Sequence, residues 1–105
     1  MKKYINNFFN VVAKENNLNL NTKLSWGFYF SNKKRDNLLS AKRNLPKNRY
    51  SHTEIIHGEN MYHLCVEEIC VHDIDSLYNR CEELKTLAKD LRINSFDGFD
   101  VEKIN

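Results

Sequence analysis

Two histidines and two cysteines near the middle of the chain are the residues best suited to metal binding. His63 and Cys65 form an H-x-C pair, Cys70 and His72 form a C-x-H pair, and zinc accepts this set of ligands. Successive side chains of a strand point to opposite faces, so the first pair should face away from the second. We therefore favour buried cysteines and partly exposed histidines, and we expect neither a metal ion nor another cofactor.

Neighbouring carboxylates are the second group of residues that chemistry could use. They occur at Glu67 and Glu68, Asp73 and Asp75, and Glu82 and Glu83. General acid–base catalysis needs two carboxylates around a substrate, whereas Glu82 and Glu83 should lie side by side on a helix surface. Asp97 and Asp100 differ in parity on the last expected strand and should diverge. With no nucleophilic triad or nucleotide-binding loop in the sequence, we expect that the protein is not an enzyme.

Charge is divided sharply along the chain. The net charge is +2, yet residues 1–50 hold eight Lys and three Arg against two acidic residues. Residues 51–105 hold five basic against twelve acidic residues. This division predicts electrostatically marked surfaces for a partner, unless the two halves interleave in space.

Length and residue usage limit the type of protein. The 105 residues provide for one domain with one core. The apolar positions between Tyr4 and Asn10 are interrupted too often for a signal peptide or a membrane span. The three cysteines are an odd number outside any disulfide framework, which fits a reducing compartment. We expect a cytoplasmic protein with free thiols and no membrane contact.

The strands can be predicted from alternation and the first helix from its period. Residues 3–15 carry apolar side chains at helical spacing and should form an amphipathic helix, with a linker to residue 23. Trp26, Phe28 and Phe30 share one parity, so residues 24–30 should form a strand with one buried face. Further strands are expected over residues 50–57, 61–71 and 96–103, with a tight turn at 58–60.

Two further helices should separate these strands. The first helix is expected to begin at a cap formed by Ser31 or Asn32 and to end before Pro46. The second should run from a cap at Asp73 or Asp75 to Arg92. The resulting order, a helix followed by β-α-β-β-α-β, predicts an α+β fold with two helices on one face of a four-stranded antiparallel sheet. The other face of that sheet would be open.

Four short motifs follow one another in the order found in a known family. They are Trp26-Gly-Phe-Tyr-Phe30, Val71-His-Asp-Ile-Asp75, Leu84-Lys-Thr-Leu-Ala88 and Phe96-Asp-Gly-Phe-Asp-Val101. Over residues 24–103 the chain resembles the regulator of ribonuclease activity B (RraB) family, with the last motif as the strongest match. The family usually has Trp at the position of Phe99 and Pro at that of His72.

The resemblance implies a ferredoxin-like domain without catalytic activity, which in the family's namesake binds ribonuclease E and lowers its activity. It divides the chain into an N-terminal helix and linker, residues 1–23, and an RraB-like domain, residues 24–105. The namesake is markedly acidic, and the basic first half of this chain departs from it.

The preferred hypothesis is a non-catalytic inhibitor whose partner is a nuclease or a nuclease-like toxin. Acidic side chains would occupy a basic cleft and aromatic ones would anchor the contact. The candidate partner-binding residues are Tyr29, Tyr62, Tyr78, Glu82, Glu83, Asp90, Asp97 and Asp100. An immunity protein that neutralises a bacterial toxin is the first alternative, and the sequence leaves the oligomeric state open.

An RNA-binding module is the second alternative, because RNA-recognition domains share this order of strands and helices. Such domains stack bases on exposed aromatic residues of the central strands. Here Tyr29 is the main aromatic residue expected on the open face. A basic cluster could instead hold phosphates without sequence preference, and it comprises Lys33, Lys34, Arg35, Lys42, Arg43, Lys47 and Arg49.

Overall fold

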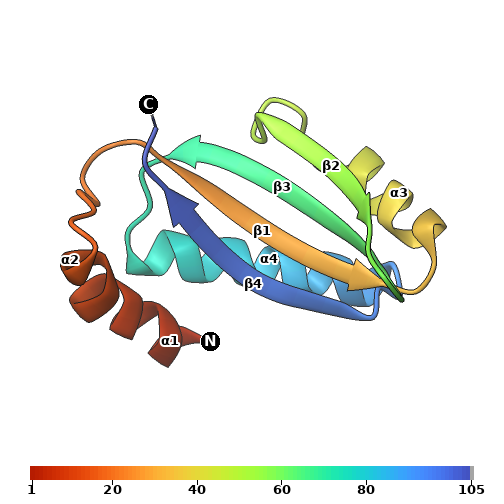
Figure 1. The fold of residues 1–105 in the computed structure, drawn as a ribbon, viewed down its shortest axis with the longest axis horizontal. Helices are drawn as coiled ribbons and strands as arrows, with labels where there is room; N and C mark the ends of the chain where they lie inside the picture. The colour runs from red at the N-terminus through yellow and green to blue at the C-terminus, as the bar shows by residue number, and fades with distance from the viewer. Residues whose placement is uncertain (105) are drawn as a thin grey trace.

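Four antiparallel strands form the centre of the molecule. The structure, a computed structural model, describes residues 1–104. The strands are β1 (Leu24–Asn32), β2 (His52–His57), β3 (Tyr62–Cys70) and β4 (Ser95–Glu102). They lie in the order β2-β3-β1-β4, so the aromatic strand β1 is central and β2 and β4 are the edges (Figure 1).

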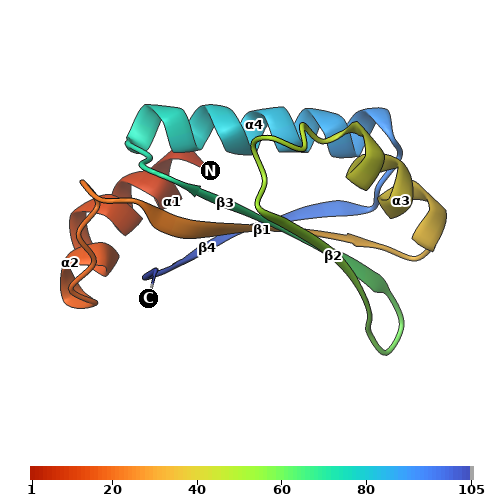
Figure 2. The same ribbon diagram turned by 90° about the horizontal axis from the view of Figure 1, so that it is seen from above.

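Both long helices lie on the same side of this sheet (Figure 2). Helix α3 (Arg35–Asn44) connects β1 to β2, and α4 (Ile74–Asp90) connects β3 to β4. The N-terminal helix consists of α1 (Lys2–Asn7), one π-helical stretch (Phe8–Val12) and α2 (Ala13–Glu15). The predicted α+β class, the four-stranded antiparallel sheet and the N-terminal helix are therefore confirmed. Within residues 1–104, no helix is both long and apolar enough to cross a membrane.

The core lies between the sheet and the helices. Trp26, Phe28 and Phe30 are completely buried, because alternation along β1 turns all three toward the helices. Helix α4 covers them with one apolar stripe, formed by the buried residues Leu77, Cys81, Leu84 and Ala88. All three cysteines are free thiols, as predicted, although Cys65 and Cys70 are only half-buried.

The N-terminal helix packs on the same domain rather than standing free. Ile5 is fully buried, and Phe8 is 7% exposed. The ring of Phe8 lies edge-on to Trp26 and to Phe99, with centroids 6.0 and 5.4 Å apart. Phe9 stacks on the same Trp26 at 6.2 Å. The helix thus closes the end of the core at which β1 begins and β4 ends (Figure 1).

One helix cap was predicted correctly and the other was not. Asp73 caps α4, accepting a hydrogen bond from the Ser76 backbone amide at 2.7 Å while the Ser76 hydroxyl accepts one from the Asp73 amide. The prediction that Ser31 or Asn32 caps α3 is wrong, because β1 continues through Asn32 and the helix begins after Lys34. Their side chains are used in contacts between strands and loops instead.

Candidate functional site: the open face of the sheet

The face of the sheet turned away from the helices is polar and acidic. Cross-strand pairing places Ser25, Gly27, Tyr29 and Ser31 of β1 on this open face, flanked by the outward residues of β3 and β4. The four strands, all of which the structure describes, contain no Lys or Arg. Five carboxylates lie on the open face, namely Glu54, Glu67, Asp97, Asp100 and Glu102.

A bulge in β4 brings two of the predicted aspartates together. The pairing of β1 with β4 shifts between Tyr29 and Phe30, so that Asp97 has no partner of its own. Gly98 adopts a φ of +113°, a conformation that side-chain-bearing residues rarely take. The prediction that Asp97 and Asp100 diverge is therefore wrong. The bulge inserts one residue into β4, which changes the alternation of its side chains and places both aspartates on the open face. A glycine inside a strand is the sequence signal for such a bulge.

Tyr29 is tied to Asp100 across the open face. Its hydroxyl donates to Asp100 Oδ2 at 2.8 Å, above Gly27. A Cβ at Gly27 would lie 2.5 Å from Asp100 Oδ1 and 2.9 Å from the Tyr29 hydroxyl, so the glycine makes room for this pair. Burial first, and the Asp100 carboxylate second, raise the pKa of Tyr29 well above its usual range.

The Asp100→Asn variant should lower the pKa of Tyr29 while leaving it above that of a free tyrosine. Removing the carboxylate removes its repulsion of the phenolate, whereas burial remains. In NMR titrations the Tyr29 ring of the variant should therefore begin to ionise at a lower pH than that of the wild type. Identical titration curves would show that the Tyr29–Asp100 contact does not form in solution.

A second cluster on the open face contains a serine, a histidine and an aspartate. The Ser31 hydroxyl lies 2.8 Å from His63 Nδ1 and donates a hydrogen bond to Asp97 Oδ2. Asp97 Oδ1 accepts another hydrogen bond, from the Ser95 hydroxyl at 2.6 Å. In a nucleophilic triad the imidazole lies between hydroxyl and carboxylate, but here the hydroxyl lies between the other two. The cluster therefore fixes Asp97 in place rather than activating Ser31.

The open face also presents apolar side chains at its margins. Ile56 of β2 and Ile69 of β3 are 48% and 44% exposed. Most of these carboxylates have no cation beside them, since among the residues described only Glu54 has an ion-pair partner on this face, His52 at 3.5 Å. An acidic centre with exposed isoleucines beside it suits a basic protein surface and repels the phosphates of nucleic acid.

The structure divides the eight predicted partner-binding residues between two sides of the molecule. Tyr29, Asp97 and Asp100 share the open face. Four others belong to helix α4 on the opposite side, namely Tyr78, Glu82, Glu83 and Asp90. Tyr62 lies at the end of β3, stacked on His57 with centroids 4.5 Å apart. The prediction did not include Glu54, Glu67 and Glu102, which join the open face through alternation alone.

A buried ion-pair network lies between β3 and α4 on the helix-covered side. Both Glu68 oxygens accept from Arg80, at 3.1 and 2.8 Å, and one also contacts His72 Nε2 at 2.8 Å. Burial alone would raise the pKa of Glu68, but the bonds from His72 and Arg80 lower it below its ordinary value. The expectation of a partly exposed histidine holds for His63 and is wrong for His72, which is 4% exposed.

The same network determines what the cysteine–histidine pattern can bind. His63 and Cys65 lie on the open face and Cys70 on the covered one, as strand alternation predicts. Glu68, Cys70 and His72 do bring ligand atoms within 4.8 Å of one another. Arg80 already holds the Glu68 carboxylate, however, and burial raises the pKa of the Cys70 thiol to about 11. This donor set suits an internal ion pair better than a cation.

Comparison with known proteins shows the family to which this chain belongs. The family model described as regulator of ribonuclease activity B (RraB) matches residues 12–101. Because this match covers most of the chain, the protein belongs to the RraB family, and membership implies a regulator of ribonuclease activity. The resemblance found in the sequence motifs is thus confirmed. Searches among curated proteins and among solved structures gave no match.

Proposed function

We propose that this protein is a non-catalytic inhibitor that binds a ribonuclease through the open face of its sheet. Family membership supports a ribonuclease as the partner. The observation that carries the proposal is the concentration of five carboxylates, without Lys or Arg, on one uncovered face. We further propose that the domain is ferredoxin-like, which the strand order β2-β3-β1-β4 and the two helices on one face support.

Charge complementarity explains how such a face would act. A ribonuclease must attract RNA phosphates, so its RNA-binding surface is basic. The acidic open face would be drawn to that surface at long range, which raises the association rate more than the final affinity. Exposed Ile56 and Ile69 would supply apolar contact once the two surfaces meet. RNA and inhibitor would then compete for one surface.

Capture followed by a cleavage assay tests the proposal. The tagged protein is incubated with nuclease-treated cell lysate, bound proteins are identified, and a captured ribonuclease is purified and assayed on labelled RNA. The expected result is a stoichiometric slowing of cleavage when the protein is added, and no cleavage by the protein alone. Failure to slow any captured ribonuclease, or RNA cleavage by the protein itself, would contradict it.

A nuclease toxin is the second candidate partner, since its nucleic-acid site would fit the same acidic face. The capture experiment identifies the bound protein. A gene for that protein beside the gene for this chain would favour the toxin, and its absence there would favour a housekeeping ribonuclease. In either case we propose that the protein acts in the cytoplasm, with which its three free thiols are compatible.

A further inference from the structure

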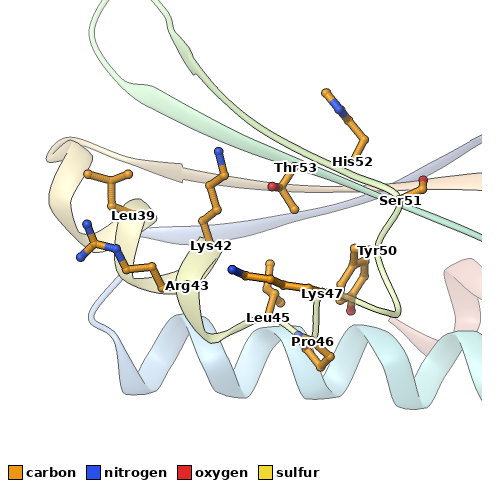
Figure 3. A pocket seen from close by; sticks show the side chains of 10 residues that line it. All are labelled: Leu39, Lys42, Arg43, Leu45, Pro46, Lys47, Tyr50, Ser51, His52 and Thr53. Atoms are coloured by element: carbon orange, nitrogen blue, oxygen red, sulfur yellow. The ribbon is translucent and has the colours of Figure 1, made fainter.

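A basic pocket lies on the helix-covered side, at the edge of the sheet formed by β2. Its volume is about 340 Å³, and it is bounded by α3, the loop after α3 and the first residues of β2. Figure 3 shows Lys42 and Arg43 extending from α3 and Lys47 from the loop, with Thr53 on β2 nearby. Apolar side chains, including Leu45 and the Tyr50 ring, complete its walls. Volumes of roughly 300 Å³ and above are typical of small-molecule sites.

The cations of this pocket are not neutralised within the protein. Among residues 1–104, Lys42, Arg43 and Lys47 take part in no ion pair, and no carboxylate lines the pocket. Arg49, two residues further along the loop, is by contrast held by Glu83 at 2.8 Å. The pocket therefore carries three positive charges without ion-pair partners, whereas the open face carries mostly unpaired negative charges.

We propose that this pocket binds a nucleotide through a phosphate monoester, either on a free nucleotide or at the end of a nucleic-acid chain. A phosphate monoester carries about two negative charges near neutral pH, and the three cations that line the pocket can balance them. Arg43 can bind two of its oxygens at once, and the lysines act as point charges. The apolar walls give the sugar and base a place that inorganic phosphate would leave empty. This proposal is independent of the ribonuclease proposal, because it concerns the opposite side of the molecule.

Titration of the labelled protein with uridine monophosphate, followed by amide NMR shifts, tests the site. The expected result is saturable shifts confined to residues 39–53, weaker at high salt, and absent with uridine. Inorganic phosphate should shift the same amides with lower affinity. Short oligouridylates with and without a terminal phosphate distinguish the two sources. If only the phosphorylated oligonucleotide saturates these amides, the natural ligand is a chain end, and if the mononucleotide does so alone, a free nucleotide is enough.

A matched pair of variants makes the outcome decisive. The pocket variant combines Lys42→Gln, Arg43→Gln and Lys47→Gln, and the control combines Lys3→Gln, Lys14→Gln and Lys23→Gln, which removes the same charge elsewhere. The pocket variant should weaken binding at least roughly tenfold, and the control much less. Equal weakening by both variants would show diffuse attraction, and no shifts with any phosphate ligand would also overturn the proposal. Both variants should retain ribonuclease binding, which separates this result from that of the acidic face.

Discussion

The Arg80→Met variant should lose about 3–5 kcal/mol of the free energy of unfolding at neutral pH. Arg80 makes two hydrogen bonds to Glu68, whose side chain is 5% exposed. Removing the guanidinium leaves a carboxylate on the covered side with His72 as its remaining partner. An uncompensated buried charge costs far more than the pair itself contributes. Denaturant unfolding followed by circular dichroism measures the loss.

The pH dependence of this loss provides an internal check. Because the pKa of Glu68 is lower in the folded than in the unfolded chain, its contribution is complete above the ordinary glutamate pKa of about 4.3 and disappears as the pH falls through the folded-state value. The difference between wild type and Arg80→Met should therefore shrink in acid. Lys85→Met is the control, since Lys85 has only the exposed Glu82 as partner, 3.6 Å away, and should change stability by less than about 1 kcal/mol. Equal losses in the two variants would contradict a buried network.

The Phe8→Ala variant should lose about 3–5 kcal/mol, which corresponds to a fall in melting temperature of roughly 12 °C or more. Its ring is packed between Trp26 and Phe99, so truncation leaves a cavity at the end of the core. Val11→Ala on the same helix is the control, because Val11 is 43% exposed and should cost well under 1 kcal/mol. Thermal unfolding compares them.

Deletion of residues 1–17 extends the same prediction to the whole helix. Ile5 and Phe8 are both buried, so the truncated protein should melt at a lower temperature and expose Trp26 to solvent. Trp26 fluorescence should then shift to longer wavelength. A truncated protein with unchanged melting, solubility and emission would exclude the contribution of the N-terminal helix to its own domain.

The fold could be predicted from the sequence because its signals are local and repeated. The single parity of Trp26, Phe28 and Phe30 defines the buried face of β1, and the spacing of Leu77 and Leu84 defines that of α4. The error at the cap of α3 has a tertiary cause. Ser31 and Asn32 prolong β1 because cross-strand partners are available to them, and no local pattern encodes those partners.

The candidate site was predicted less well, because it depends on which charges the fold brings together. Glu83 and Asp97 are both acidic residues that the sequence predicts to bind a partner. Glu83, however, is bound by Arg49 and Arg80, which tertiary folding places beside it. Asp97 reaches the open face only through the bulge at Gly98. The burial of His72 depends on its contact with Glu68 around the end of β3. Only the bulge left a signal in the sequence, a glycine inside a strand.

The most direct test of the acidic-face account is the association rate of the captured ribonuclease with two charge variants. The open-face variant combines Asp97→Asn, Asp100→Asn and Glu102→Gln, and the helix-face variant combines Glu82→Gln, Glu83→Gln and Asp90→Asn. Each removes three carboxylates, so net charge is matched and only position differs. We expect at least a roughly tenfold slower association for the open-face variant and a much smaller change for the helix-face variant. The reverse order, or equal slowing by both, would contradict it.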